Sequence, residues 1–277
     1  MIKLATLEMN FIFNRHLQRI RAQRWGAALS HPLHHFLHEM LHERLSYILR
    51  QFKSVLIIGE FKYQPSSQDC YVIKMGSSVE ALSEHLPFKE GAFDLIISYM
   101  DLHQANDVPG ILKQVNYCLQ PDGLFLGVFL GGNSLWQLRA AAQHAELLTR
   151  RGCSPRVAPM ISLHDAAALL QRAGFAIPVL DHEPFELKGN NPFSLLQQLK
   201  ELQLSNSLYD GFKGLTGKKF LSELESYLSE KTALNLELDI LCMSGWAPAA
   251  TQQQPLPRGS GQKSLASVLE TSSSFLD

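Results

Sequence analysis

Short apolar runs alternate with longer amphipathic stretches through the centre of the chain. A run such as SVLII at 54–58, closed by a glycine, is typical of a strand buried in a parallel sheet. Strands are predicted in this way at 54–58, 70–75, 93–98 and 124–130. Helical spacing predicts helices at 108–119, 134–149, 162–173, 192–203 and 217–230. The alternation predicts an α/β fold, with an open, mainly parallel sheet covered on both faces.

The two ends of the chain show different patterns. Residues 10–29 and 31–49 predict two helices before the first strand. Two late strands are predicted at 177–187 and 234–245, and the second alternates as an edge or antiparallel strand would. From Ala247 the sequence turns to Gln, Pro, Gly and Ser, which predicts disorder. We therefore expect an N-terminal helical lid (1–52), an α/β domain (53–246) and a disordered tail (247–277).

Composition narrows the class of protein. The chain has 277 residues, of which 45% are apolar, and a formal net charge of −1, which disfavours a nucleic-acid binder. Its four cysteines stand far apart, as expected of reduced thiols in a cytoplasmic protein. We find no secretory signal and no apolar run of the roughly 18–20 residues that a membrane span needs. The sequence thus favours a soluble cytoplasmic protein.

Charge is concentrated near the N-terminus. Residues 15–24 are rich in arginine and contain no acid. Such a stretch more often forms a solvated or partner-docking face than a nucleic-acid site, and no aromatic stacking platform accompanies it. A peripheral membrane contact through residues 11–25 is a further possibility.

A series of motifs in chain order carries a resemblance to a known family. Leu86-Pro87-Phe88 with Phe93–Ser98 reads as the "LPF…FDLVxS" pair of many methyltransferases. More specific segments are Phe13-Asn14-Arg15, Leu102-His103 with Asn106-Asp107, GGNSLWQLR at 131–139, residues 154–175, LKELQLSNS at 199–207, Gly245-Trp246 and PRGS at 257–260. The chain resembles class I S-adenosylmethionine (SAM) methyltransferases. It is most similar to the methyltransferase-fold assembly factor of respiratory complex I, the protein-arginine hydroxylase family.

The resemblance implies a Rossmann-like methyltransferase fold with a SAM site at the carboxyl ends of the first strands. There the family uses a glycine-rich turn, an acid for the ribose and an aspartate for the adenine. Here the turn reads Gly59-Glu60-Phe61-Lys62, Lys74 and Met75 stand at the ribose position, and Leu82 stands at the adenine position. The chain from 61 to 69 is also too short for a helical crossover, which needs roughly 10–12 residues. We expect a fold truncated in its first βα units, with N-terminal helices and a C-terminal antiparallel strand.

Few residues remain as candidates for a cofactor site. If SAM binds, we expect Gly59, Glu60, Met100 and His103 to contact it. Gly59 could equally be the residue that ends a strand, and His103 a loop histidine satisfied by the backbone. Asp94 is expected to cap or pair at the start of its strand rather than to catalyse, and no catalytic residue is assigned.

Five histidines, at positions 31, 34, 35, 38 and 42, recur at helical spacing. Several of them share one helix face, a geometry that can hold zinc or copper. Because no HExxH motif occurs and His-rich tracts are often compositional, we predict no metal site.

Retention of the outer segments with loss of the cofactor motif predicts a non-catalytic or weakly catalytic assembly factor. It would need no cofactor and would hold a protein partner such as a respiratory complex subunit. The alternative is an active SAM-dependent enzyme, either an arginine hydroxylase or an O-methyltransferase such as the malonyl-carrier-protein enzyme.

Overall fold

The computed structural model describes residues 11–26, 28–65, 69–75, 84–150, 152–253, 259–261 and 264. Leu82 and most of the predicted disordered tail lie outside these residues. The division into a lid, an α/β domain and a tail therefore stays a prediction.

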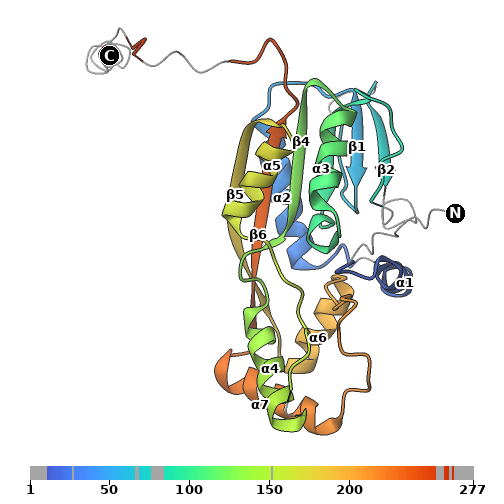
Figure 1. Ribbon diagram of the computed structural model, residues 1–277, viewed down its shortest axis with the longest axis vertical. Coiled ribbons are helices and arrows are strands. Elements are labelled where there is room, and N and C mark those ends of the chain that lie inside the picture. Colours follow the sequence, from blue (N-terminus) through green and yellow to red (C-terminus); the bar gives the residue numbers. More distant parts are fainter. Residues whose placement is uncertain are drawn as a thin grey trace, which may run out of the picture.

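One six-stranded sheet forms the centre of the molecule (Figure 1), in the order β2-β1-β3-β4-β6-β5. The strands are β1 (Ser54–Ile58), β2 (Tyr71–Met75), β3 (Phe93–Tyr99), β4 (Leu119–Gly131), β5 (Ala176–Lys188) and β6 (Asn235–Trp246). The first four run parallel, while β6 pairs antiparallel with both β4 and β5. This confirms the predicted α/β fold and the late antiparallel strand. The late strand was predicted to be an edge or an antiparallel strand. The edge position is wrong, because β6 lies between β4 and β5.

Helices cover both faces of this sheet. They are α2 (Pro32–Ser46), α3 (Val108–Cys118), α4 (Trp136–Arg150), α5 (Leu163–Arg172), α6 (Pro192–Glu201) and α7 (Lys218–Lys231). The first helix, α1 (Arg15–Trp25), contributes no residue to either core. Buried side chains of α3 and α5 belong to the core of one face, and those of α2, α4, α6 and α7 to the core of the other. In Figure 1, α4, α6 and α7 gather at the lower end of the molecule, below α2. All seven residues of β3 are buried, as its apolar sequence predicts.

The first crossover is short, as predicted. Residues 59–70 connect β1 to its parallel neighbour β2, and the described part of this connection, 59–65 and 69–70, contains no helix. A complete βα unit would place a helix here, with its N-terminus at the carboxyl end of β1. Side chains, and not the N-terminus of a crossover helix, therefore surround the carboxyl end of β1.

Segments distant in sequence hold two of the turns. Residues 121–123 form a register shift near the start of β4. There the carbonyl of Gly123 accepts from the backbone N–H of Ala247 at 2.8 Å. Ser134 lies two residues before α4, and its hydroxyl accepts from the N–H of Asp239 at 2.9 Å. In both cases a segment distant in sequence competes for the local hydrogen bond.

Asp94 joins the starts of two strands. Its carboxylate, at the start of β3, accepts from the backbone N–H of Lys53 at 2.7 Å and of Ser54 at 2.9 Å. The side chain is buried. The prediction that Asp94 pairs at the start of its strand is confirmed, since it anchors β1.

The four cysteines are free thiols, as the sequence predicts. Within the described ranges, no helix combines the length and the hydropathy that crossing a membrane requires.

Candidate functional site

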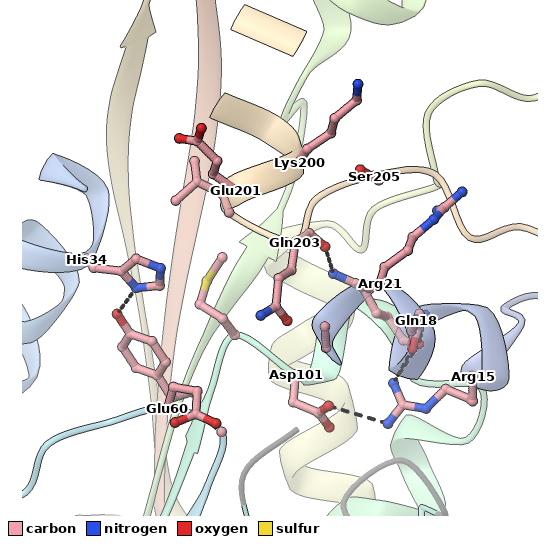
Figure 2. Close-up of a pocket in the computed structure, with 16 residues that line it drawn as sticks. Arg15, Gln18, Arg21, His34, Glu60, Asp101, Lys200, Glu201, Gln203 and Ser205 are labelled. Atoms are coloured by element: carbon pink, nitrogen blue, oxygen red, sulfur yellow. Dashed lines mark hydrogen bonds and ion pairs between the residues drawn. The ribbon is translucent and has the colours of Figure 1, made fainter. Parts of the chain in front are cut away.

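A small cavity lies at the carboxyl ends of β1 and β3, with a volume of about 90 Å³. Gly59 and Glu60 line it after β1, and Tyr99 and Met100 line it from β3. Arginines of α1 and residues that follow α6 close the opposite side, as Figure 2 shows. Sites for small molecules usually measure roughly 300–1,000 Å³, so this cavity is smaller than a nucleoside cofactor requires.

Gly59 is required by the approach of two strands. Its φ is +102°, which L side chains rarely adopt, and its N–H donates to the carbonyl of Met75 at 2.8 Å. A Cβ at this position would lie 2.2 Å from the carbonyl oxygen of Tyr99. The glycine therefore has a structural role at the end of β1, whatever binds beside it.

Phe61, which directly follows the cavity-lining Glu60 in the chain, is buried. Only 1% of its surface is exposed, and it belongs to the core under α2. Its ring stacks on His38 with centroids 4.7 Å apart, and lies 5.2 Å from His42 and 5.7 Å from Tyr99. Aromatic contacts of this kind fill the end of β1 with side chains. A bulky residue at this position of the motif has become part of the core.

His34 and Tyr99 form a buried polar pair. The Tyr99 hydroxyl lies 2.7 Å from Nδ1 of His34, as drawn in Figure 2. Burial, with a smaller effect of neighbouring histidines, lowers the pKa of His34 to about 4, and burial raises the pKa of Tyr99. His34 is therefore neutral at pH 7, and a single hydrogen bond joins its Nδ1 to the Tyr99 hydroxyl.

Arg15 joins α1 to the loops behind the cavity. Its guanidinium pairs with Glu84 at 3.2 Å and with Asp101 at 3.3 Å, and donates to the carbonyl of Gln104 at 3.0 Å. Burial raises the pKa of Asp101, and Arg15 opposes that effect. The arginine-rich stretch was predicted to be a solvated or partner-docking face. The solvated face is wrong for Arg15, whose side chain is only 12% exposed and is paired with these two acids.

The loop motif found in the sequence holds the same N-terminal segment. The Asn106 side chain accepts from the N–H of Phe13 at 2.8 Å and donates to its carbonyl at 3.1 Å. Asp107 caps α3 by accepting from Gly110 at 2.9 Å. Glu84 accepts from the backbone N–H groups of Asn106 and Asp107, each at 2.8 Å. These polar residues join the N-terminal segment at Phe13 to the loop before α3.

The structure brings together three of the four predicted cofactor contacts. Gly59, Glu60 and Met100 line the small cavity, while His103 does not. His103 lines a second cavity and is buried, and burial with the nearby charge of Arg15 lowers its pKa to about 3. Whether these residues bind a cofactor stays a prediction.

The second cavity is the larger feature, with a volume of about 630 Å³. Most of its lining is apolar and comes from the end of β4, from α4, α6 and α7, and from Val157–Met160. Arg21, Gln104, Lys200 and Ser205 line both cavities, so the two adjoin there. The sequence did not predict this cavity, because the pattern of its apolar residues is the same as that of residues in a filled core.

The histidine stripe does not form a metal site among the described residues. His34 bonds Tyr99, while His38 and His42 lie against Phe61. His31 caps α2 by accepting from Leu33 at 3.1 Å. The helical spacing thus serves aromatic packing and capping.

Comparisons with known proteins agree with this fold. The methyltransferase domain family matches residues 63–127. The human mitochondrial arginine-hydroxylase NDUFAF5 is 34% identical over 195 residues, which are 69% of this chain and 56% of that protein. A putative methyltransferase of Rickettsia prowazekii, RP459, is 36% identical over 53% of this chain and 65% of its own. The malonyl-[acyl-carrier protein] O-methyltransferase of Methylovorus is 30% identical over 62% of this chain and 57% of its own.

These matches span between about half and two thirds of each of the three relatives. Among solved structures, the YcgJ protein of Bacillus subtilis is 15% identical with a TM-score of 0.48, over 76% of this chain and 99% of that one.

Replacing Gly59 with alanine is expected to destabilise the protein by about 2 kcal/mol, the usual range for a strained backbone with a close contact. The added Cβ would meet the Tyr99 carbonyl. Urea unfolding measures the change. Gly152→Ala is the matched control, because a Cβ there meets nothing within 4 Å; equal stability of the two variants would refute the role given to Gly59.

Stability is expected to fall as the pH drops from about 6.5, where an unfolded histidine takes up its proton, to about 4, where folded His34 does. Because the folded pKa is the lower one, protonation favours the unfolded chain across this window. His34→Gln removes this titration and should flatten the dependence of Tm on pH, so that only the part contributed by His103 remains. His35→Gln, at an exposed neighbour whose charge affects His34 less than burial does, should change the profile much less.

Proposed function

Because the chain has a class I methyltransferase fold and is similar in sequence to the arginine-hydroxylase NDUFAF5, we propose that it is a complex I assembly factor with little or no SAM-dependent catalysis. The observation that carries this proposal is the closed end of β1. Phe61 is buried there against two histidines and Tyr99, and a cavity of about 90 Å³ remains.

The residues present do not fit SAM as the family holds it. At the end of β2 stand Lys74 and Met75, and neither side chain can accept the two ribose hydroxyls. The match to the methyltransferase domain begins at residue 63, after the turn that should cradle the cofactor. Leu82, at the adenine position, lies outside the described residues. We therefore expect no cofactor at this position.

A protein partner has a candidate contact surface on α1 and the residues before it. Phe11, Ile12, Ile20 and Trp25 are each nearly half exposed, although large apolar side chains are usually buried. Aromatic anchors of this kind dominate the energy of many protein interfaces. The partner we propose is a respiratory complex subunit, and contact of residues 11–25 with a membrane surface is the other use of this segment.

An active SAM-dependent enzyme, either an arginine hydroxylase or an O-methyltransferase, is the second candidate. It is favoured by the cavity that Gly59, Glu60 and Met100 share, and by the enzymatic names of two relatives. The location of the protein is a separate question, for which we propose the cytoplasm. Free thiols favour a reducing compartment such as the cytoplasm, whereas the NDUFAF5 relatives are named mitochondrial.

Calorimetric titration of SAM and S-adenosylhomocysteine into the full chain should show no saturable binding below about 1 mM. Each lost hydrogen bond to a buried or charged group costs about 1–3 kcal/mol. Three losses weaken binding by several orders of magnitude. A known SAM-binding methyltransferase serves as the positive control. Micromolar affinity of this chain for SAM would contradict the proposal and support the enzyme.

The tagged full chain is expected to co-purify with a respiratory complex subunit, identified by mass spectrometry. Trp25→Ala should reduce the amount retained by about tenfold or more, because loss of an aromatic anchor typically costs 2 kcal/mol or more. Leu49→Ala is the matched control, at a fully exposed apolar residue on a different element. Equal retention by both variants would exclude α1 as the contact surface.

A further inference from the structure

The 630 Å³ cavity has its own chemistry, distinct from that of the small cavity beside Gly59. Its apolar part is formed by leucines and phenylalanines of α4, α6 and α7, including Leu138, Leu196, Phe220 and Leu224. The volume lies within the range of sites that enclose most of a small ligand. A space of this size and polarity can hold an apolar body of many carbon atoms.

Polar residues gather where the two cavities adjoin. Arg21, Gln104, Lys200 and Ser205 stand there (Figure 2 labels Arg21, Lys200 and Ser205). They come from α1, from the loop after β3, and from α6 and the segment after it. The lining is thus divided into a polar end and an apolar body.

The charge of the lining has one sign. Arg21, Lys200 and Arg156 line the cavity, and no Asp or Glu does. Arg156 is neutralised by Glu146, which lies 2.7 Å away and is itself buried. Arg21 takes part in none of the ion pairs found among the described residues, and donates to the carbonyl of Asn206. Its charge is only partly solvated, so a negative group beside it is favoured.

His103 supplies an unused donor in the same lining. The Gln104 amide nitrogen donates to the carbonyl of Gln203 at 3.1 Å and lies 3.0 Å from Nε2 of His103. Nε2 is therefore the acceptor, and the proton of the neutral ring is on Nδ1. This Nδ1 is buried without a partner in the described part of the chain, and His103 is more than nine-tenths buried. Because this atom has almost no accessible surface, a ligand in the cavity would not reach it, and the cationic groups of the polar end are Arg21 and Lys200.

We propose that this cavity binds a linear aliphatic carboxylate, with its alkyl chain among α4, α6 and α7 and its carboxylate at Arg21 and Lys200. A peptide segment fits less well, because it would bring backbone N–H and C=O groups into a lining that offers them few partners. The inference does not depend on SAM and goes beyond the function proposed above.

Binding of octanoate, decanoate and dodecanoate to the full chain tests this assignment, by calorimetry below the concentrations at which they form micelles. Affinity should rise about fourfold per added methylene, as expected for burial of an alkyl chain. Decanol should bind at least about tenfold more weakly than decanoate, because it lacks the charge that Arg21 and Lys200 recognise. Absence of saturable decanoate binding below about 1 mM overturns the proposal.

Two variants separate the ends of the site. Arg21→Gln should bring decanoate close to the affinity of decanol while the chain-length dependence remains, and Arg24→Gln, an exposed control on the same helix, should change neither. Leu196→Trp, at a half-buried lining residue, should fill the apolar part and weaken all three acids. Thermal unfolding verifies that each variant folds. Decanoate binding that neither Arg21→Gln nor Leu196→Trp alters would place the acid elsewhere and refute the assignment.

Discussion

The carbonyl oxygen of Tyr99 lies where the Cβ of any side chain at position 59 would have to be placed. This steric constraint determines how the chain leaves β1. Because β1 and β3 approach so closely at their ends, the chain must leave β1 through a glycine with positive φ. The next large side chain, Phe61, then enters the core beneath α2 instead of remaining in a loop. The Tyr99 ring in turn meets both Phe61 and His34. A short crossover and a dense aromatic cluster are thus two aspects of one arrangement.

A second set of contacts holds the N-terminal segment over this region. Arg15 bonds to Glu84 and Asp101, and Asn106 clamps the backbone of Phe13. Buried charges are costly unless they are paired, and here both acids have the same guanidinium as a partner. Polar residues that a functional reading would assign to a ligand are used to position α1. The remaining groups at this end, Arg21 among them, face the space between α1 and α6.

The two adjoining cavities differ in the way their walls are made. The small one is bounded by strand ends, whose positions are fixed by the hydrogen bonds of the sheet. The large one is bounded mainly by side chains of three helices that pack against one another beyond the parallel strands. Loss of space at the strand ends therefore leaves the helical cavity intact. Whatever binds in the second cavity does not need the cofactor motif that the first has lost.

The sequence by itself determined the parallel strands, the helices and the missing crossover helix, because hydrophobic period and segment length are local properties. It also indicated that Asp94 would pair at its strand and that residue 61 was too large for a cofactor turn. Only the tertiary structure decided which of the arginines at 15–24 turn inward, since Arg15 pairs with acids 69 and 86 residues away. It also separated His103 from Gly59 and opened the large cavity. Such features arise where elements distant in sequence meet, and no local pattern records them.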